Sequence, residues 1–327
     1  MNKQMTFVDA LNEAHFEEME ANEKVIVMGE DVELAYVFGV SKGLMDRFGK
    51  DRVRDTPISE LGIVGAGVGA AMAGYRPIIE IMFMDFIMLA MDPLVNQAAK
   101  LRYMLGGQLS VPLVVRTPSG GGVQYGSTHS QCLEAWFMQI PGIKVAVPSD
   151  PADAKGLMKS AIRDDNPVLF VEHKMIYKLK GEVPEGEHLV PFGQASIKRS
   201  GTDVTLIGIG YQVQNCLAAA DILEDEGINV EIVDPRTIAP LDVATIAESV
   251  RKTNRCVIVE EGHLRSGVGS EISASIQEEA FDYLDAPIER VAALNAPIPF
   301  EPSLEDFVLP NSGNIVDACK KVLGVKI

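Results

Sequence analysis

Two kinds of hydrophobic pattern alternate along the chain. Short runs rich in β-branched residues are almost continuously apolar, and longer windows between them, such as 150–165, repeat apolar residues at helical spacing. Buried parallel strands have continuous apolar runs because helices cover both faces of their sheet. The runs that predict strands begin at Val25, Arg76, Val111, Ile143 and Pro167, and later at Asp203, Ile228 and Arg255. The pattern therefore predicts an α/β fold with parallel sheets.

The alternation stops over residues 177–194, which are rich in glycine, proline and charge and show neither period. Such a segment is typical of a boundary between domains. We therefore expect a first domain over 1–185, a linker over 186–200 and a second α/β domain over 201–327.

Composition narrows the possible functions. The 327 residues carry 29 Lys and Arg against 46 Asp and Glu, a formal net charge of −17, which repels nucleic acid and anionic membrane surfaces. The most apolar stretch, 78–95, is interrupted by three acids and is not a membrane span. The start has no apolar signal region, and the four cysteines form no C-x-x-C pair. We expect a cytoplasmic protein.

One predicted helix has an unusual number of small residues. Gly62, Gly65 and Gly69 fall on a single helical face, which predicts a close approach by another backbone. Their spacing is not the G-x-G-x-x-G of a dinucleotide site. Glu60 stands at the start of this helix, where a carboxylate either caps the helix or, if buried, holds a proton through a raised pKa.

Two further residues are candidates for chemistry. His129 lies in a glycine-rich loop after a predicted strand, where ligands bind in parallel α/β sheets, although a loop histidine is often only structural. Phe86 belongs to a run of methionine and phenylalanine that is typical of a core or an interface. One aromatic at such a junction could also stack on a flat cofactor ring.

Several long motifs occur in a recognisable order: RVRDTPISELGIVGAGVGAAMAGYRPIIEIMFMDF, a GGG loop ending in THSQ, SAIRDDNPVLF, DPRTIAPLD and FEPSLEDFVLP. With them, the chain resembles, essentially end to end, the β subunit of the thiamine-diphosphate-dependent first component of 2-oxoacid and acetoin dehydrogenase complexes. The resemblance implies a thiamine-diphosphate pyrimidine-binding domain followed by a transketolase C-terminal domain.

The resemblance also implies roles for individual residues. Glu60 matches the glutamate that bonds the ring nitrogen of the cofactor's aminopyrimidine, and Phe86 matches the aromatic that stacks on that ring. His129 matches a histidine near the reacting centre that helps in transfer to lipoamide. The main-chain ligands of a potassium ion in such subunits correspond to Leu113, Ala161, Ile162, Asp164 and Asn166.

A motif of the family that is missing from this sequence implies partners. The diphosphate and its Mg²⁺ are held in such enzymes by a G-D-G motif, and no GDG occurs in this chain. The resemblance thus implies an α subunit that supplies this half of the site, a heterotetramer of two α and two β chains, and no activity of the β subunit alone. It also implies docking to a lipoyl acyltransferase core through that core's basic subunit-binding domain, with which the charge of −17 is compatible.

The choice of substrate rests on finer motifs. EIMFMDFIMLAMD, RYMLGG and EGEHLVPFG favour an acetoin dehydrogenase subunit, which cleaves acetoin and passes the two-carbon unit to lipoamide. The alternatives are a subunit that acts on pyruvate or on a branched-chain 2-oxoacid. A hypothesis of another class is a non-catalytic nucleotide-binding or scaffolding α/β protein.

Overall fold

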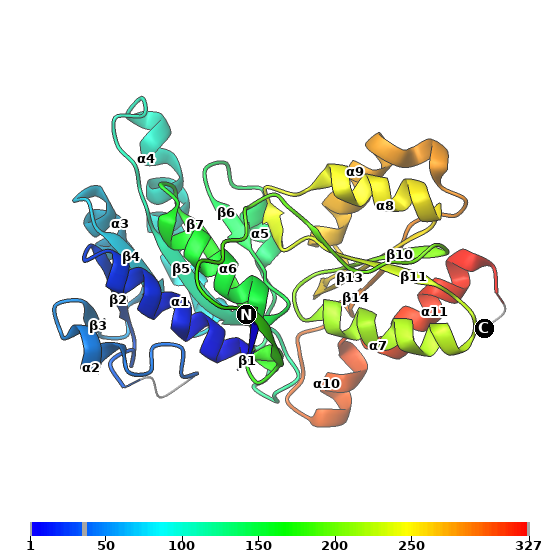
Figure 1. Ribbon diagram of the computed structural model, residues 1–327, viewed down its shortest axis with the longest axis horizontal. Coiled ribbons are helices and arrows are strands. Elements are labelled where there is room, and N and C mark those ends of the chain that lie inside the picture. The colour runs from blue at the N-terminus through cyan, green and yellow to red at the C-terminus, as the bar shows by residue number, and fades with distance from the viewer. Residues whose placement is uncertain (1, 35–37, 326–327) are drawn as a thin grey trace. The chain divides into compact units, whose positions relative to one another are not determined.

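The computed structural model describes residues 2–34 and 38–325, which form two α/β units (Figure 1). The first unit comprises Met1–Ser119 and Trp136–Phe192, and the second comprises Gly120–Ala135 and Gly193–Ile327. The chain thus passes into the second unit inside the segment 186–200 that was expected to be a linker. The sequence did not indicate that the glycine-rich segment 120–135 groups with the second unit.

The first unit is built on a parallel sheet with spatial order β6-β7-β5-β4-β2-β3. Its strands are β6 (Lys144–Ala146), β7 (Val168–His173), β5 (Val114–Ser119), β4 (Arg76–Glu80), β2 (Val25–Gly29) and β3 (Val53–Asp55). All residues of β5 and β7 are buried. The parallel sheet predicted from continuous apolar runs is therefore confirmed.

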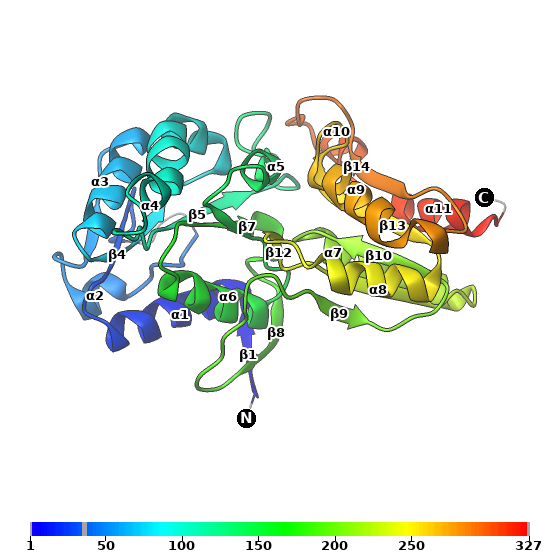
Figure 2. The same ribbon diagram turned by 90° about the horizontal axis from the view of Figure 1, so that it is seen from above.

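Helices cover both faces of this sheet, as Figure 2 shows. On one face lie α1 (Phe7–Ala21) and α6 (Pro151–Arg163), and on the other lie α3 (Glu60–Met72) and α4 (Ala99–Met104). Shorter elements complete the unit: α2 (Leu44–Phe48), the 3₁₀ helices η1 (Met84–Ala90) and η3 (Lys174–Ile176), and the π-helical η2 (Asp92–Ala98). The helix α5 (Glu134–Met138) lies where the chain returns to the first unit.

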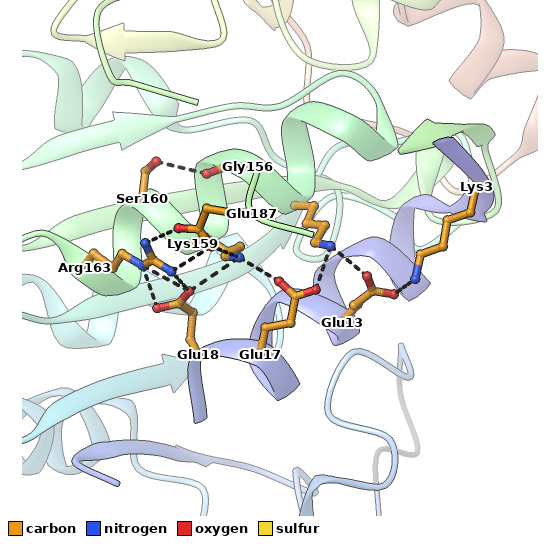
Figure 3. A network of polar contacts seen from close by, with 10 residues as sticks. Lys3, Glu13, Glu17, Glu18, Gly156, Lys159, Ser160, Arg163 and Glu187 are labelled. Carbon is orange, nitrogen blue, oxygen red and sulfur yellow. Dashed lines mark hydrogen bonds and ion pairs between the residues drawn. The ribbon is translucent and has the colours of Figure 1, made fainter. Parts of the chain in front are cut away.

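A charge network joins α1 to α6 (Figure 3). Lys155 is fully buried, and its Nζ donates to Glu13 at 2.7 Å and to Glu17 at 2.8 Å. Lys159, one helical turn further on, binds Glu17 at 2.7 Å, and Arg163 binds Glu18 at 2.7 Å. Because these cations recur every four residues, they form a row along the face of α6 that meets α1.

A two-stranded antiparallel sheet pairs β1 (Asn2–Thr6) with β8 (Lys180–Pro184). Strand β8 lies inside the segment 177–194 that showed no period. The sequence did not predict this strand because only main-chain pairing with a distant segment defines it, and glycine, proline and charge mask its pattern.

The packing around the glycines of α3 differs from what the sequence predicted. Among the described residues, nothing lies within 4 Å of a Cβ placed on Gly65 or Gly69. Gly67 is the glycine that packing requires, because a Cβ there would lie 2.8 Å from the side chain of Ile79. The face formed by Gly62, Gly65 and Gly69 is exposed in this chain, so the close approach predicted there is not made within it.

The second unit contains a mixed sheet with order β14-β13-β10-β11-β9, in which only β9 runs antiparallel to its neighbour. The strands are β14 (Glu289–Ala293), β13 (Cys256–His263), β10 (Val204–Gly208), β11 (Val230–Asp234) and β9 (Ser196–Arg199). In Figure 1, α7 (Gln212–Asp225) and α11 (Ser312–Leu323) cover one face, and α8 (Val243–Thr253) and α9 (Val268–Ala280) cover the other. The remaining elements are β12 (Thr237–Ala239), η4 (Phe281–Tyr283) and α10 (Pro302–Val308).

The core of the second unit is aliphatic and includes Cys216 and Cys319 as free thiols, and Cys256 is a further buried free thiol of this unit. Burial raises the pKa of Cys319 to about 12 and raises that of Cys216 well above its usual value. These thiols therefore serve as small apolar side chains. In the part of the chain that the structure describes, no helix has the length and apolarity required to cross a bilayer.

Candidate active site

Glu60 is the first residue of α3, where the sequence placed it. The Ser59 side chain makes no capping bond, and Glu60 itself is only 5 % exposed. Among the described residues, the Glu60 carboxylate has no hydrogen-bond or salt-bridge partner. A helix-capping role requires a bond to a main-chain N–H, so capping does not explain this residue. A largely buried side chain whose carboxylate has no partner within the described chain is instead suited to bind a polar group from outside the chain.

Further acidic side chains lie in the electrostatic neighbourhood of Glu60. Glu30 follows β2 directly, and its pKa is raised first by burial and then by the negative charges of Glu60, Asp31 and Glu80. Like charges that are close together disfavour ionisation, so Glu30 binds a proton more readily than an isolated carboxyl group. Glu30 was not predicted from the sequence, although its position at the carboxyl end of a predicted strand is typical of a ligand-binding residue in this fold class.

A buried arginine next to Glu80 connects three neighbouring strands of the same sheet. From β5, Arg116 donates Nε to Glu172 of β7 at 2.7 Å, and it also bonds Glu80 at the end of β4. The Tyr177 hydroxyl donates to Glu172 at 2.7 Å. Burial raises the pKa of Glu80 despite the nearby guanidinium, while the two glutamates hold the pKa of Arg116 above its usual value against burial. These bonds hold β4, β5 and β7 together at Glu80, one of the acids that raise the pKa of Glu30.

Phe86 lies on η1 and belongs to an aromatic cluster of the first unit. Its ring is 5.7 Å from that of Phe83 at an interplanar angle of 80°, and Phe83 meets Phe38 at the same distance and angle. Phe83 is buried, whereas Phe86 is half-buried. Phe86 is therefore the more accessible ring of this pair and the one on which a flat ring could stack.

His129 belongs to the second unit, whereas Glu60 and Phe86 belong to the first. Its imidazole is half-buried, and Nδ1 lies 3.1 Å from the hydroxyl oxygen of Thr128. Its main-chain N–H donates to the carbonyl oxygen of Gly126 at 3.3 Å. The loop around His129 is bound to α10 and to the end of β13.

The carbonyl groups expected to bind potassium gather around the end of α6. Arg76 donates Nη1 to the carbonyl oxygen of Ile162 at 3.0 Å and to that of Asp164 at 2.9 Å. The carbonyl of Ala161 accepts the N–H of Asp164 at 3.2 Å. The last carbonyl groups of a helix carry partial negative charge, which attracts a cation. A guanidinium of the chain therefore already binds two of the oxygens that were expected to hold potassium.

The other two expected ligands lie on neighbouring segments. The carbonyl oxygen of Leu113 accepts the N–H of Val168 at 2.8 Å. The N–H of Asn166 donates to the Asp164 carboxylate at 2.9 Å. A potassium ion would therefore have to share the carbonyl oxygen of Leu113 with the hydrogen bond from Val168, which its second lone pair permits.

The chain is similar to known families over nearly its whole length. Residues 3–180 match the transketolase pyrimidine-binding domain, and residues 193–315 match the transketolase C-terminal domain. A solved structure of a split-gene transketolase, described as an inactive β4 tetramer, aligns over 99 % of both chains with a TM-score of 0.81 and 23 % identity. This likeness confirms the fold expected from the sequence.

Curated relatives are more similar in sequence. The chain is 48 % identical to the mitochondrial pyruvate dehydrogenase E1 component subunit beta of Dictyostelium discoideum, over 98 % of this chain and 91 % of that protein. It is 50 % identical to the corresponding subunit of Rhizobium meliloti, over 97 % and 70 %. It is 46 % identical to the acetoin:2,6-dichlorophenolindophenol oxidoreductase subunit beta of Bacillus subtilis, over 99 % and 98 %.

Proposed function

Since the chain belongs to the family of β subunits of the pyruvate and acetoin dehydrogenase first components, we propose that it is the β subunit of a pyruvate dehydrogenase. In this reaction the bond from the keto carbon to the carboxylate breaks and CO₂ leaves. The acyl carbon is oxidised as the S–S bond of lipoamide is reduced, one sulfur taking the acetyl group and the other a proton. The relatives at 48 and 50 % identity support pyruvate as the substrate.

Acetoin is the second candidate substrate. A relative named for acetoin oxidation is 46 % identical over 99 % of this chain, which is close to the identity of the pyruvate relatives. The motifs that favoured acetoin in the sequence thus have partial support. Branched-chain 2-oxoacids remain the third possibility raised by the sequence.

The observation that carries the proposal is Glu60 at the start of α3, a largely buried residue whose carboxylate has no partner among the described residues. Thiamine diphosphate, when bound, supplies a carbon nucleophile and an electron sink for C–C bond cleavage. We assign to Glu60 the hydrogen bond to the aminopyrimidine ring nitrogen, where it holds or shares a proton, and to Phe86 the stacking contact. We assign to His129 the orientation of the acyl-transfer step toward lipoamide.

We also infer the partners from the family. An α subunit carrying GDG would hold the diphosphate and Mg²⁺, so that two α and two β chains form the active component. The acidic surface of this chain, with its charge of −17, is complementary to a basic docking domain of a lipoyl acyltransferase core. A potassium ion at the end of α6 and a cytoplasmic location are also part of the proposal.

The test uses the complex of this chain with its α subunit and a dye as electron acceptor. We expect turnover that requires thiamine diphosphate, faster with pyruvate than with acetoin, and no turnover by either chain alone. Glu60→Gln, which keeps the shape of the side chain but cannot exchange a proton, should lower kcat by about 100-fold or more. The control Glu23→Gln removes an exposed carboxylate of the same unit and should leave kcat unchanged.

Each outcome separates the hypotheses. Turnover with acetoin and none with pyruvate would reverse the order of the two substrates. An assembled Glu60→Gln complex with full activity would disprove the assigned role of Glu60. A complex that binds no thiamine diphosphate and turns over neither substrate would favour the non-catalytic scaffolding hypothesis.

A further inference from the structure

The glycine-rich loop that carries His129 is bound by a carboxylate of α10. Glu305 accepts the main-chain N–H of Gly122 at 2.9 Å and that of Gln124 at 3.0 Å. Both segments belong to the second unit, although they are more than 180 residues apart in sequence. Glu305 is only 1 % exposed, so its carboxylate is removed from water.

The burial pattern of α10 is unusual for a surface helix, because it buries an acid and exposes apolar residues. Its buried residues are Glu305 and Val308, whereas Leu304 is 53 % exposed and Phe307 is 73 % exposed. A surface helix ordinarily buries its apolar residues and exposes its charges. Burying a carboxylate is unfavourable unless hydrogen bonds replace its water, and the loop N–H groups are the partners that do so here.

The loop is shaped to bring its backbone onto this carboxylate. A Cβ on Gly121 would lie 2.8 Å from the side chain of Leu309 and 3.3 Å from a carboxylate oxygen of Glu305. Gly122 and Gln124 have φ values of +85° and +59°, the left-handed conformation that turns main-chain N–H groups toward an anion. A side chain at position 121 or a regular backbone at 122 would prevent these bonds.

Further contacts extend the attachment on both sides. The N–H of Gly121 donates to the Glu261 carboxylate at 2.7 Å, and Glu261 also accepts from the amide of Gln212 at 3.0 Å. Closer to the histidine, the hydroxyl of Ser127 donates to the carbonyl oxygen of Ile298 at 2.9 Å. The backbone is thus held at several points between 121 and 127, immediately before His129.

We propose that Glu305 is a positioning residue for the loop that carries His129. Its buried carboxylate fixes the main chain of residues 121–124 and, through it, the position of His129. Glu305 acts through the backbone and touches no substrate. The inference rests on the proposed function only for what His129 does, since the attachment of the loop is independent of any reaction.

The first test is hydrogen–deuterium exchange of the loop in the assembled αβ complex. Glu305→Gln removes the negative charge and presents an NH₂ group to the loop N–H groups. We expect amide exchange in the peptide 120–131 to rise by about tenfold or more. The control Asp306→Asn removes an exposed carboxylate of the same helix and should leave that exchange unchanged. Unchanged exchange in Glu305→Gln would overturn the proposal.

The second test is kinetic. Glu305→Gln should lower kcat for transfer to lipoamide by about tenfold, with a smaller change in the KM for pyruvate, and Glu305→Asp, which keeps the charge, should recover part of the loss. If Glu305 acts through His129, the double variant with His129→Gln should be no slower than His129→Gln alone. Additive losses would mean that Glu305 acts elsewhere and would overturn the proposal.

The two tests fail in different ways. If the proposed function is wrong, the wild-type complex shows no turnover, yet the exchange measurement still decides whether Glu305 holds the loop. If Glu305→Gln does not assemble, the same exchange measurement is made on Glu305→Asp, whose shorter side chain should loosen the loop to a smaller extent. An assembled Glu305→Asp complex whose loop exchanges as slowly as the wild type would then contradict the proposal.

Discussion

The two units of the chain bury glutamate side chains against different partners. In the first unit, Glu80 and Glu172 bind the guanidinium of Arg116. In the second, Glu305 and Glu261 accept main-chain N–H groups of the loop that carries His129. The first arrangement ties strands of one sheet to each other. The second fixes the conformation of a loop that has no regular secondary structure.

This difference has a physical basis. A buried ion pair removes two charges from water and gains stability only when its geometry is good, but losing one partner is very costly. A carboxylate bound by N–H groups needs no second charge, and it satisfies donors that a loop leaves unpaired. Glu231 and Glu60 belong to neither arrangement. Glu231 binds both Lys252 and the N–H of Gly201, and Glu60 has neither kind of partner among the described residues.

The largest expected effect on stability is the removal of the cation of the first unit. Arg116→Met should destabilise the protein by about 3–5 kcal/mol, because Glu80 and Glu172 would remain buried without a counter-charge. The measurement is urea unfolding of the assembled complex. The control Arg47→Met removes an exposed arginine paired with Glu20 and should cost less than about 1 kcal/mol.

If Arg116→Met lowers the free energy of unfolding by less than about 1 kcal/mol, then Glu80 and Glu172 bind protons readily when the guanidinium is removed. In that case the first unit would not depend on buried ion pairs, and the contrast with the second unit would fail.

The next largest effect is a pH dependence in the second unit. Burial raises the pKa of Glu260 to about 7, although it accepts the N–H of Gly269 at 3.0 Å. In the unfolded chain the value is near 4.5, so between these two values the folded state binds more protons than the unfolded state. The contribution of Glu260 to stability should therefore rise by about 2.5 kcal/mol as the pH falls from about 8 to about 5.

Glu260→Gln isolates this contribution from that of other acids. The variant should gain stability over the wild type at high pH and lose that advantage at low pH, as followed by thermal unfolding. Glu248→Gln, at an exposed position of the same unit, should show no such difference. A constant difference between Glu260→Gln and the wild type would mean that Glu260 does not titrate in this range.

How much of this could be predicted from the sequence depends on the range of the interactions. Strands such as Val168–His173 and the helix start at Glu60 were predicted because periodicity and helix signals are local. The pairing of β1 with β8 joins segments at opposite ends of the first unit and leaves no local pattern. Gly67, the glycine that packs on Ile79, could not be separated from its neighbours without the sheet beneath it.

The candidate active site was likewise predictable only where a local motif marks the residue. Glu60, Phe86 and His129 are candidates that the motifs indicated, and the structure adds that Glu60 is largely buried and has no partner among the described residues. Glu305 was not predicted, because the sequence SLEDF is typical of an ordinary surface helix. Only the structure shows that loop N–H groups donate to the carboxylate of Glu305. Long-range contacts to main-chain atoms leave no trace in side-chain patterns, which is why this attachment was missed.

A smaller effect of opposite sign is expected in the first unit. His15 is buried, and its pKa is lowered from 6.5 to about 4, first by burial and then by the charge of Arg116. The unfolded state therefore binds the proton more readily, and stability is lost as the pH falls below 6.5. Between about pH 7 and about pH 5 the loss should be about 2 kcal/mol relative to His15→Gln. His263→Gln, an exposed histidine of the second unit, should not change the pH dependence.

The smallest effect is expected where the ion pairs of the first unit reach solvent. Glu187 binds Lys159 and Arg163, which lower its pKa to about 2, but its side chain is 59 % exposed. Solvent screens such pairs, so Glu187→Gln should cost only about 0.5 kcal/mol, and added salt should reduce this cost further. Lys155→Met, at the fully buried end of the same network, should cost several times more in the same unfolding assay, because Glu13 and Glu17 would lose their shared cation. Equal costs at the two ends would mean that burial does not set the strength of these pairs, and the comparison between the units would then have to rest on geometry alone.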